Sequence, residues 1–258
     1  MTIRLEKLIP IPLLEQGTSG SGVWDQEAIQ FERGKHYLVE APSGKGKTTL
    51  LSILYGLRKD YQGWVFLDQQ DVTSFGWKRW SILRKKHFSF IFQGLELFDS
   101  LTARENIELK NAITGHHSSS QIEEMAGELG IKPFLDRKAG ILSFGQQQRV
   151  AILRAMCQPF DILIADECFS HIDSHNREIA FDLLQRECRR QGAGMILTSL
   201  NNMENLQTDV RFSHNTRINL WMTFPATLKL PGKSTMLCCC FYLAGGSYGG
   251  SEMKSLVK

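Results

Sequence analysis

The sequence of 258 residues lacks a long apolar run, which argues against a chain that crosses a membrane by itself. About 20 consecutive apolar residues are needed to span a bilayer, whereas the most apolar run, at 236–244, is much shorter. The N-terminus also lacks the apolar segment of a secretory signal peptide. We therefore expect no transmembrane segment, so that any work at a membrane requires a partner that crosses it.

Cysteine and net charge are also scarce. The six cysteines do not form a disulfide scaffold, and Cys157, Cys168 and Cys188 stand alone within patterned segments, which is typical of reduced thiols in a cytoplasmic protein. The formal net charge is only +3, from 30 Lys and Arg against 27 Asp and Glu, so no strongly basic surface for nucleic acid is indicated. With 42% hydrophobic and 22% charged residues, the composition excludes a disordered or fibrous protein.

Short apolar runs alternate with helical periodicity along most of the chain. The pattern predicts strands at 37–41, 63–68, 88–92, 162–165 and 195–198, and helices at about 47–57 and 176–190. This alternation favours an α/β fold with a mainly parallel sheet. Short strands before residue 40 predict an additional small antiparallel β region, and the helical pattern at about 94–159 predicts a helical insertion.

The predicted helix at 176–190 is amphipathic. Its apolar positions, which we expect to face the core, are Ile179, Leu183 and Leu184. Asp182 and Arg186 are four residues apart, and this spacing predicts an ion pair on the exposed face.

A glycine-rich segment joins the strand at 37–41 to the helix that follows it. It reads Ala41-Pro-Ser-Gly-Lys-Gly-Lys-Thr48, which is the phosphate-loop pattern G-x-x-x-x-G-K-[ST] with alanine at the first glycine. Glycines allow successive N–H groups to turn toward phosphate oxygens, and a helix N-terminus favours the same anion. Lys47 would contact the terminal phosphates, and Thr48 would hold Mg²⁺. The expected phosphate-binding residues are Pro42, Ser43, Gly44, Lys45, Gly46, Lys47, Thr48 and Thr49.

Two acidic residues end the apolar strand at 162–165. Ligands gather at the carboxyl ends of the strands in open α/β sheets, so Asp166 and Glu167 should face the phosphate loop. Asp166 is the expected Mg²⁺ partner, and Glu167 is the expected base that activates an attacking water.

Between these two sites lies Leu142-Ser-Phe-Gly-Gln-Gln-Gln-Arg-Val150, continued by Ala151-Ile-Leu-Arg-Ala155. This stretch resembles the signature sequence L-S-G-G-Q of ATP-binding cassette (ABC) proteins. Gln93 resembles the glutamine of that family's Q-loop, and Ser170-His-Ile-Asp173 resembles its D-loop. These elements follow the family's order over about residues 1 to 200. The chain resembles the ATP-binding subunit of an ABC transporter, most like those of lipoprotein-release and macrolide-export systems.

The resemblance implies a P-loop nucleotide hydrolase core that binds ATP and Mg²⁺ and couples hydrolysis to transport. It implies a homodimer that binds ATP between its subunits, with Asp173 at the seam. Gln93 would contribute to the metal site, sense the γ-phosphate and transmit the change to a membrane permease. Such a subunit is cytoplasmic and lies on the inner face of the cell membrane through its permease. The residues expected to bind the partner's nucleotide are Ser143, Phe144, Gly145 and Gln146.

Besides Ala41, three positions depart from the family's pattern. Phe144 stands at the third signature position, which is usually glycine, and Cys168 stands in place of a proline and is interpreted as a buried thiol. Ser199 follows the strand at 195–198, where the resemblance implies a switch histidine, and His214 is too distant in sequence to replace it. Serine is shorter than histidine and does not titrate near neutral pH, so hydrolysis is expected to be impaired.

Two other functions stay open at this point. Ala41, Phe144 and Ser199 also fit a regulatory module that senses ATP with little hydrolysis. A soluble ABC protein of translation or DNA repair is disfavoured, because tandem cassettes or a coiled-coil insertion do not fit in 258 residues.

For several further residues, a structural interpretation is favoured over a functional one. Trp24 is a candidate to stack on adenine, but a core tryptophan is favoured. The histidine pairs His116-His117 and His171 with His175 lack a neighbouring Cys or acid set at ligand spacing, so surface loop histidines and no metal site are expected. The basic residues around Trp77 and Trp80 indicate the solvent-exposed face of a helix rather than a nucleic-acid site; they are Lys78, Arg79, Arg84, Lys85 and Lys86.

The expected ATP-binding domain covers residues 1–211, and the tail at 212–258 has no readable pattern. A divergent C-terminal extension and a change of reading frame both fit the tail. Cys238-Cys-Cys240 within it fits either an apolar strand or an acylated, membrane-touching patch.

Overall fold

The computed structural model describes residues 1–14, 22–24, 26–200 and 206–213. His214 and the cysteines at 238–240, discussed above, lie outside these residues, as does the tail from 214 onward. None of the helices in the described ranges is both long enough and apolar enough to cross a bilayer.

The main sheet is parallel. Within the described part of the chain, five strands take the order β6-β7-β8-β3-β9. Every residue of β7 and β8 is buried, which is typical of parallel strands that are covered on both faces. Their side chains alternate between the two faces, so that Leu163 and Ala165 enter one hydrophobic cluster while Ile162 and Ile164 enter another. The strands are β3 (His36–Glu40), β6 (Phe88–Ile91), β7 (Ile162–Asp166), β8 (Gly194–Ser199) and β9 (Val210–Ser213).

A smaller antiparallel sheet packs on one side of the main sheet. Among the residues that can be placed, its four strands take the order β2-β1-β4-β5, and the central strand β1 pairs with both β2 and β4. The strands are β1 (Thr2–Pro10), β2 (Ala28–Glu32), β4 (Tyr61–Leu67) and β5 (Gln70–Asp71). The sequence prediction of a parallel sheet with a small antiparallel region is confirmed.

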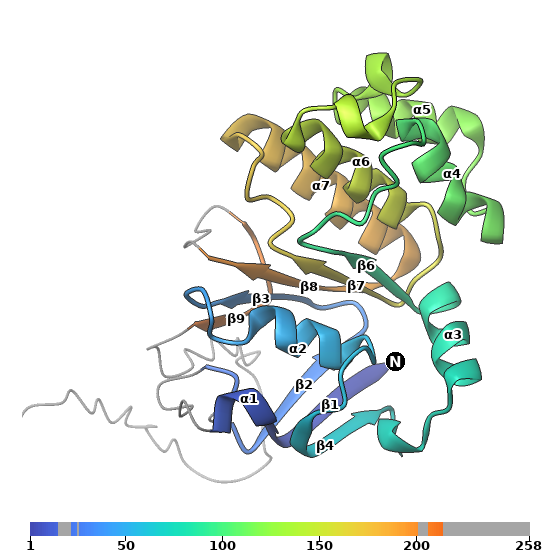
Figure 1. Ribbon diagram of the computed structural model, residues 1–258. Helices are drawn as coiled ribbons and strands as arrows, with labels where there is room; N and C mark the ends of the chain where they lie inside the picture. The colour runs from blue at the N-terminus through green and yellow to red at the C-terminus, as the bar shows by residue number, and fades with distance from the viewer. Residues whose placement is uncertain (15–21, 25, 201–205, 214–258) are drawn as a thin grey trace, which may run out of the picture. The chain divides into compact units, whose positions relative to one another are not determined.

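Helices cover the two faces of the main sheet differently (Figure 1). The insertion predicted at about 94–159 contains α4 (Ala103–Thr114), α5 (Ser119–Glu128) and α6 (Phe144–Met156), which lie with α7 (Ser174–Gln191) on one side. The other side holds α2 (Lys47–Leu54) and the small sheet. The remaining helical elements are α1 (Ile11–Leu14), α3 (Trp77–Lys86) and the short 3₁₀ turns at Val72–Ser74, Lys132–Phe134 and Ala139–Ile141.

Helix α7 corrects one local prediction. Leu183 and Leu184 are buried as expected, and Ile179 is half-buried. The expected Asp182–Arg186 pair is wrong, because Arg186 instead forms hydrogen bonds of 2.6 and 2.8 Å to the carboxylate of Glu128 at the end of α5. Tertiary packing thus pairs Arg186 with Glu128, which is 58 positions away in sequence, instead of with Asp182, which is one helical turn away.

The basic helix α3 behaves as predicted. Trp80 is buried, whereas Lys78, Arg79, Lys85 and Lys86 are exposed. Arg84 is half-buried and donates to the carbonyl oxygens of Tyr55 and Gly56.

Strand β9 continues past the expected domain boundary at 211. It pairs with β3 through Ser213, so Phe212 and Ser213, which were assigned to the tail, belong to the main sheet.

Candidate functional site: a phosphate loop facing two buried acids

The glycine-rich loop joins the carboxyl end of β3 to the start of α2. Gly44 and Gly46 both have left-handed backbones, with φ of 77° and 85°. A Cβ at Gly44 would meet no atom within 4 Å, whereas one at Gly46 would lie 2.7 Å from Leu13 and 3.1 Å from Trp24. Gly46 is also the N-cap of α2, and no side chain caps it in the described structure. The first turn of a helix leaves N–H groups without intrahelical partners, so this end of α2 is suited to an anion.

Lys47 is folded back into the loop. Its Nζ donates hydrogen bonds to the carbonyl oxygens of Ala41 (2.6 Å) and Pro42 (3.1 Å) and lies 3.2 Å from Glu167 Oε1. The side chains of Lys47 and Glu167 are only 4% and 8% exposed, so this ion pair is shielded from water. Ala41, at the first glycine position of the pattern, donates its backbone N–H to the carbonyl of Ser199.

The two acids lie at the carboxyl end of β7, as predicted. Asp166 pairs in register with Thr198 of β8, whose hydroxyl donates to Asp166 Oδ1 at 2.7 Å. The same hydroxyl oxygen accepts a 3.1 Å hydrogen bond from the N–H of Glu167. Thr198 therefore orients both acids. Its polar side chain at the end of an otherwise apolar strand was a signal in the sequence that the prediction missed.

Glu167 is held from two sides. Lys47 approaches Oε1, and the side-chain amide of Gln93 donates to Oε2 at 3.3 Å. The backbone of Glu167 is left-handed, with φ of 47°, a conformation that is costly for a residue other than glycine and is concentrated at functional sites. The structure thus joins Gln93, Lys47 and Glu167, which are far apart in sequence.

The remaining residues predicted at the loop lie on its rim. Pro42, Ser43, Lys45 and Thr48 are exposed, and Thr49 is half-buried in the first turn of α2. Ser199 lies at the end of β8 in register with Glu40, and it is buried.

The signature segment begins helix α6 and is already capped by its own side chains. Ser143 Oγ accepts from the N–H of Gln146 (3.3 Å), and Gln146 Oε1 accepts from the N–H of Ser143 (3.0 Å). A Cβ on Gly145 would lie 2.8 Å from the carbonyl oxygen of His171, so glycine is needed there for close packing. Phe144 is 44% exposed and packs edge-on against the His171 ring, with centroids 4.4 Å apart.

Asp173 caps the next helix. Its carboxylate accepts from the backbone N–H (3.0 Å) and the side-chain amide (2.6 Å) of Asn176 in the first turn of α7. These hydrogen bonds lower the pKa of Asp173 below its ordinary value. The signature and D-loop segments contact each other through Phe144, Gly145 and His171.

Cys168 is buried between the acids and the D-loop, as predicted, and burial raises the pKa of its thiol. It is a packing residue in this structure.

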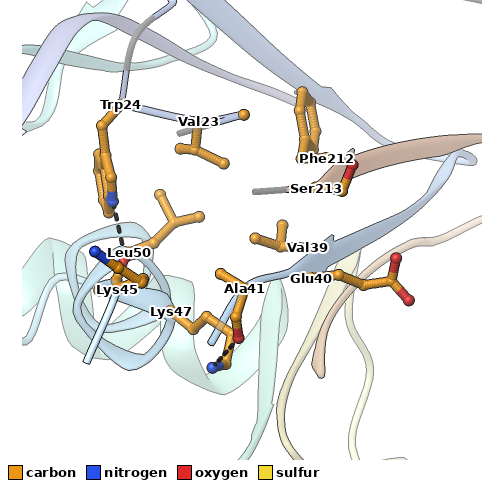
Figure 2. A pocket seen from close by; sticks show the side chains of 12 residues that line it. Val23, Trp24, Val39, Glu40, Ala41, Lys45, Lys47, Leu50, Phe212 and Ser213 are labelled. Carbon is orange, nitrogen blue, oxygen red and sulfur yellow. Dashed lines mark hydrogen bonds between the residues drawn. The ribbon is translucent and has the colours of Figure 1, made fainter. Parts of the chain in front are cut away.

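A pocket opens beside the phosphate loop (Figure 2). Its walls include Val23 and Trp24 before β2 and Phe212 on β9, with Lys45 and Gly46 at the loop. Trp24 is 6% exposed, and its indole N–H donates to the carbonyl of Lys45 at 3.0 Å. Trp24 is thus a buried residue that supports the loop, as the favoured interpretation predicted.

Comparison with known proteins agrees with this geometry. The family model described as ABC transporter matches residues 25–170, which is more than half of the chain. The chain belongs to the ABC transporter family. MacB of Shewanella oneidensis, a macrolide export ATP-binding/permease protein, is 36% identical over 174 residues, covering 66% of this chain and 26% of MacB. LolD of Syntrophotalea carbinolica, a lipoprotein-releasing system ATP-binding protein, is 33% identical over 186 residues, covering 71% of this chain and 82% of LolD.

The chain therefore spans about a quarter of the length of the MacB relatives and most of the length of LolD. The solved dimeric structure of MJ0796, a bacterial ABC transporter cassette, superposes with a TM-score of 0.67 at 24% identity and covers 83% of this chain and 95% of the cassette. At this identity the likeness shows the fold, which is that of an ABC cassette.

The residues at the phosphate loop fit a magnesium nucleotide. Asp166 and Glu167 are 1% and 8% exposed, and Glu167 lies beside the ammonium of Lys47, so the end of β7 offers hard oxygen ligands of the kind that Mg²⁺ prefers. The open space at Gly44 and the N-terminus of α2 offer backbone donors for phosphate.

Proposed function

We propose that the chain is the ATP-hydrolysing subunit of an ABC transporter and that two copies bind ATP between them. The observation that supports this most is the convergence of Lys47, Gln93 and Glu167 at the mouth of the phosphate loop. A phosphate-binding ammonium, a carboxylate base and a sensing amide are then within one hydrogen-bond network.

Each residue has a distinct role in this proposal. Lys47 breaks its contacts with Glu167 and with the carbonyl oxygens of Ala41 and Pro42, and it then binds the terminal phosphates. Thr48 and Asp166 hold Mg²⁺, with Gln93 as a further ligand. The metal, when bound, neutralises charge that develops on the phosphate oxygens. Once Lys47 has moved, Glu167 Oε1 is available to accept a proton from the attacking water. Thr198 holds the carboxylate of Asp166 and the backbone of Glu167 in place through its two hydrogen bonds.

Dimer formation follows from where the second half of the expected site lies. Residues 143–146 contact the D-loop and form the capped start of α6. We infer that they contribute to the nucleotide held by the phosphate loop of a second copy, as the resemblance to the family implies. The expected roles of Ser143, Phe144, Gly145, Gln146 and Asp173 therefore require the homodimer.

The partner of this dimer is a membrane permease. The similarity to LolD and to the ATP-binding part of MacB supports a subunit that lies on the cytoplasmic face of the membrane through that permease. The transported substrate is selected by the permease.

Glu167→Gln is the decisive variant. The amide keeps the size of the side chain and removes the base, which typically contributes about 10²–10⁴-fold to the rate. We expect ATPase activity to fall by about that factor and the variant to form a stable dimer with ATP in size-exclusion chromatography with light scattering. The matched control is Glu178→Gln, an exposed position on α7 that should leave both properties unchanged. A Glu167→Gln chain that binds ATP and remains monomeric at all concentrations contradicts the dimer proposal.

The second candidate is the ATP-sensing module with little hydrolysis, which the buried serine at position 199 favours. Ser199→His separates the two. If Ser199 replaces a functional switch residue, the histidine variant should hydrolyse ATP on the order of 10²-fold faster, since one positioned group is commonly worth that much. Equal rates for the variant and the unchanged chain, both well above background, exclude the sensing module.

A further inference from the structure

A second cluster of polar residues lies away from the phosphate loop, where the α4–α5 connection meets α7. His116 and His117 occupy this connection, and Glu187 reaches them from the last third of α7. Glu187 Oε1 lies 3.4 Å from His116 Nε2 and 3.6 Å from His117 Nε2. The expectation of two surface loop histidines is wrong, because the side chains of His116 and His117 are 16% and 3% exposed.

His117 is the most unusual member of the cluster. Both of its ring nitrogens are buried, and neither has a hydrogen-bond partner among the described residues. The separation of 3.6 Å from Glu187 is too long for a good hydrogen bond. A buried imidazole left in this state costs free energy, and such a group calls for a ligand that the protein atoms do not supply.

The backbone around the pair is held firmly. Asn111, a buried residue of α4, donates its amide to the carbonyl of His117 (2.9 Å) and accepts from the His117 N–H (3.0 Å). Gly115 ends α4 with a left-handed backbone, and Ser118 caps α5. The two histidines therefore sit in a short, fixed connection between two capped helices.

We propose that His116, His117 and Glu187 bind one divalent transition-metal ion of the Zn²⁺ class. Imidazole nitrogens and a carboxylate oxygen are typical Zn²⁺ ligands, with bonds of about 2.0–2.1 Å. A tetrahedral ion with such bonds separates its ligand atoms by about 3.3–3.4 Å. The distances of 3.4 and 3.6 Å from Glu187 Oε1 to the two imidazoles are close to this value. Water completes the fourth position.

Arg190 must move for the ion to enter. Its guanidinium now donates to Glu187 (2.7 Å) and contacts His116 Nε2 (2.7 Å). The Arg190 side chain is 46% exposed, so it can turn into solvent when the cation takes its place. Gln191 also donates to Glu187 Oε1 at 2.6 Å, and this bond can shift to the other carboxylate oxygen.

The cluster supplies the ligand types that a cation of this class takes. Two imidazoles and one carboxylate offer one ligand atom each, and these atoms lie within 4.8 Å of one another. Bound there, the ion would fasten the α4–α5 connection to α7.

The test measures metal binding directly, in the absence of nucleotide. Tag-free full-length protein is stripped with a chelator and titrated with Zn²⁺ by calorimetry and with Co²⁺ by visible absorption. We expect one ion per chain, the absorption typical of tetrahedral Co²⁺, and a rise in Tm with Zn²⁺. His117→Gln and Glu187→Gln should each weaken Zn²⁺ binding by on the order of 100-fold or more, since loss of an outer-shell partner alone costs about 10–100-fold.

Three further variants keep the result interpretable. His116→Gln changes a partly exposed ligand, so it should lose affinity while the protein stays folded by circular dichroism. His175→Gln removes an exposed histidine of α7 and should bind Zn²⁺ like the unchanged chain. Arg190→Gln removes the competing cation and should bind at least as tightly. The proposal is overturned if the chain binds no Zn²⁺ or Co²⁺, or if the three ligand variants bind as well as His175→Gln.

Discussion

The N-termini of α2 and α6, which we propose as the two halves of one nucleotide site, are built in opposite ways. At α2, glycines with left-handed backbones shape the loop, no side chain caps the helix in the described structure, and Lys47 is folded back onto nearby carbonyls. At α6, Ser143 and Gln146 form a complete capping box, and Gly145 is required by packing against His171. The α2 end thus leaves its first N–H groups without a side-chain cap, whereas the first N–H groups of α6 are capped by the helix's own side chains.

The largest effect that would test this comparison is the loss of the ammonium at α2. Lys47→Met should weaken ATP binding by about 10–100-fold, because hydrogen bonds to charged groups contribute about 1.5–3 kcal/mol each. Calorimetric titration with ATP and Mg²⁺ measures the change. Lys59→Met, at an exposed position beyond the end of α2, is the matched control and should bind as the unchanged chain does. Equal affinities for Lys47→Met and Lys59→Met would remove α2 from the nucleotide site.

The two ends should also differ in why they need glycine. Gly145→Ala places a Cβ 2.8 Å from a backbone oxygen, so we expect a loss of about 1–3 kcal/mol in the free energy of unfolding from overpacking. Gly44→Ala meets no atom and should cost about 1 kcal/mol from the left-handed backbone alone. Urea denaturation of both variants measures the difference. A Gly145→Ala chain as stable as the parent would show that the α6 turn is not tightly packed.

The capping box at α6 should have a smaller, separate effect. Ser143→Ala removes the acceptor for the N–H of Gln146, and loss of such a cap typically costs about 1 kcal/mol. Ser143→Thr keeps the acceptor and should retain most of the stability. Thermal denaturation compares the two, and identical losses in both variants would contradict a capping role.

The smallest expected effect distinguishes the neutral cap of α6 from the ionised cap of α7. The pKa of Asp173 is lowered in the folded chain by its hydrogen bonds from Asn176, so its contribution to stability is present above the unfolded pKa, about 4, and is lost as pH falls through the lower folded value. Asp173→Asn keeps a cap that does not titrate. We therefore expect it to flatten the acid side of the stability profile slightly. A profile between pH 2 and 5 that matches the parent would show that Asp173 contributes no pH dependence.

Much of this site could be predicted from residues that are close together in sequence. The phosphate loop lies where its glycines and the adjacent strand predicted it, and Asp166 and Glu167 end a buried strand as expected. Both predictions use only neighbouring residues: a glycine turn before a helix, and an acid directly after an apolar strand. Such patterns can be recognised without knowing which distant residues pack against them. The hydrogen bond from Gln93 to Glu167 was not predicted, because the two residues are 74 positions apart in sequence.

What the sequence by itself determined, then, is the order of strands and helices, the phosphate loop and the acids at the sheet edge, since each is set by backbone preference and hydrophobic periodicity over a few residues. Only the tertiary structure determined which side chains pair when they are far apart in sequence. It placed Thr198 on both acids, gave Arg186 to Glu128 instead of Asp182, and brought Glu187 to two histidines about 70 positions earlier. The physical reason is that these side chains pair only because packing of the core places their helices and strands next to one another. The spacing of residues within one segment does not determine that packing.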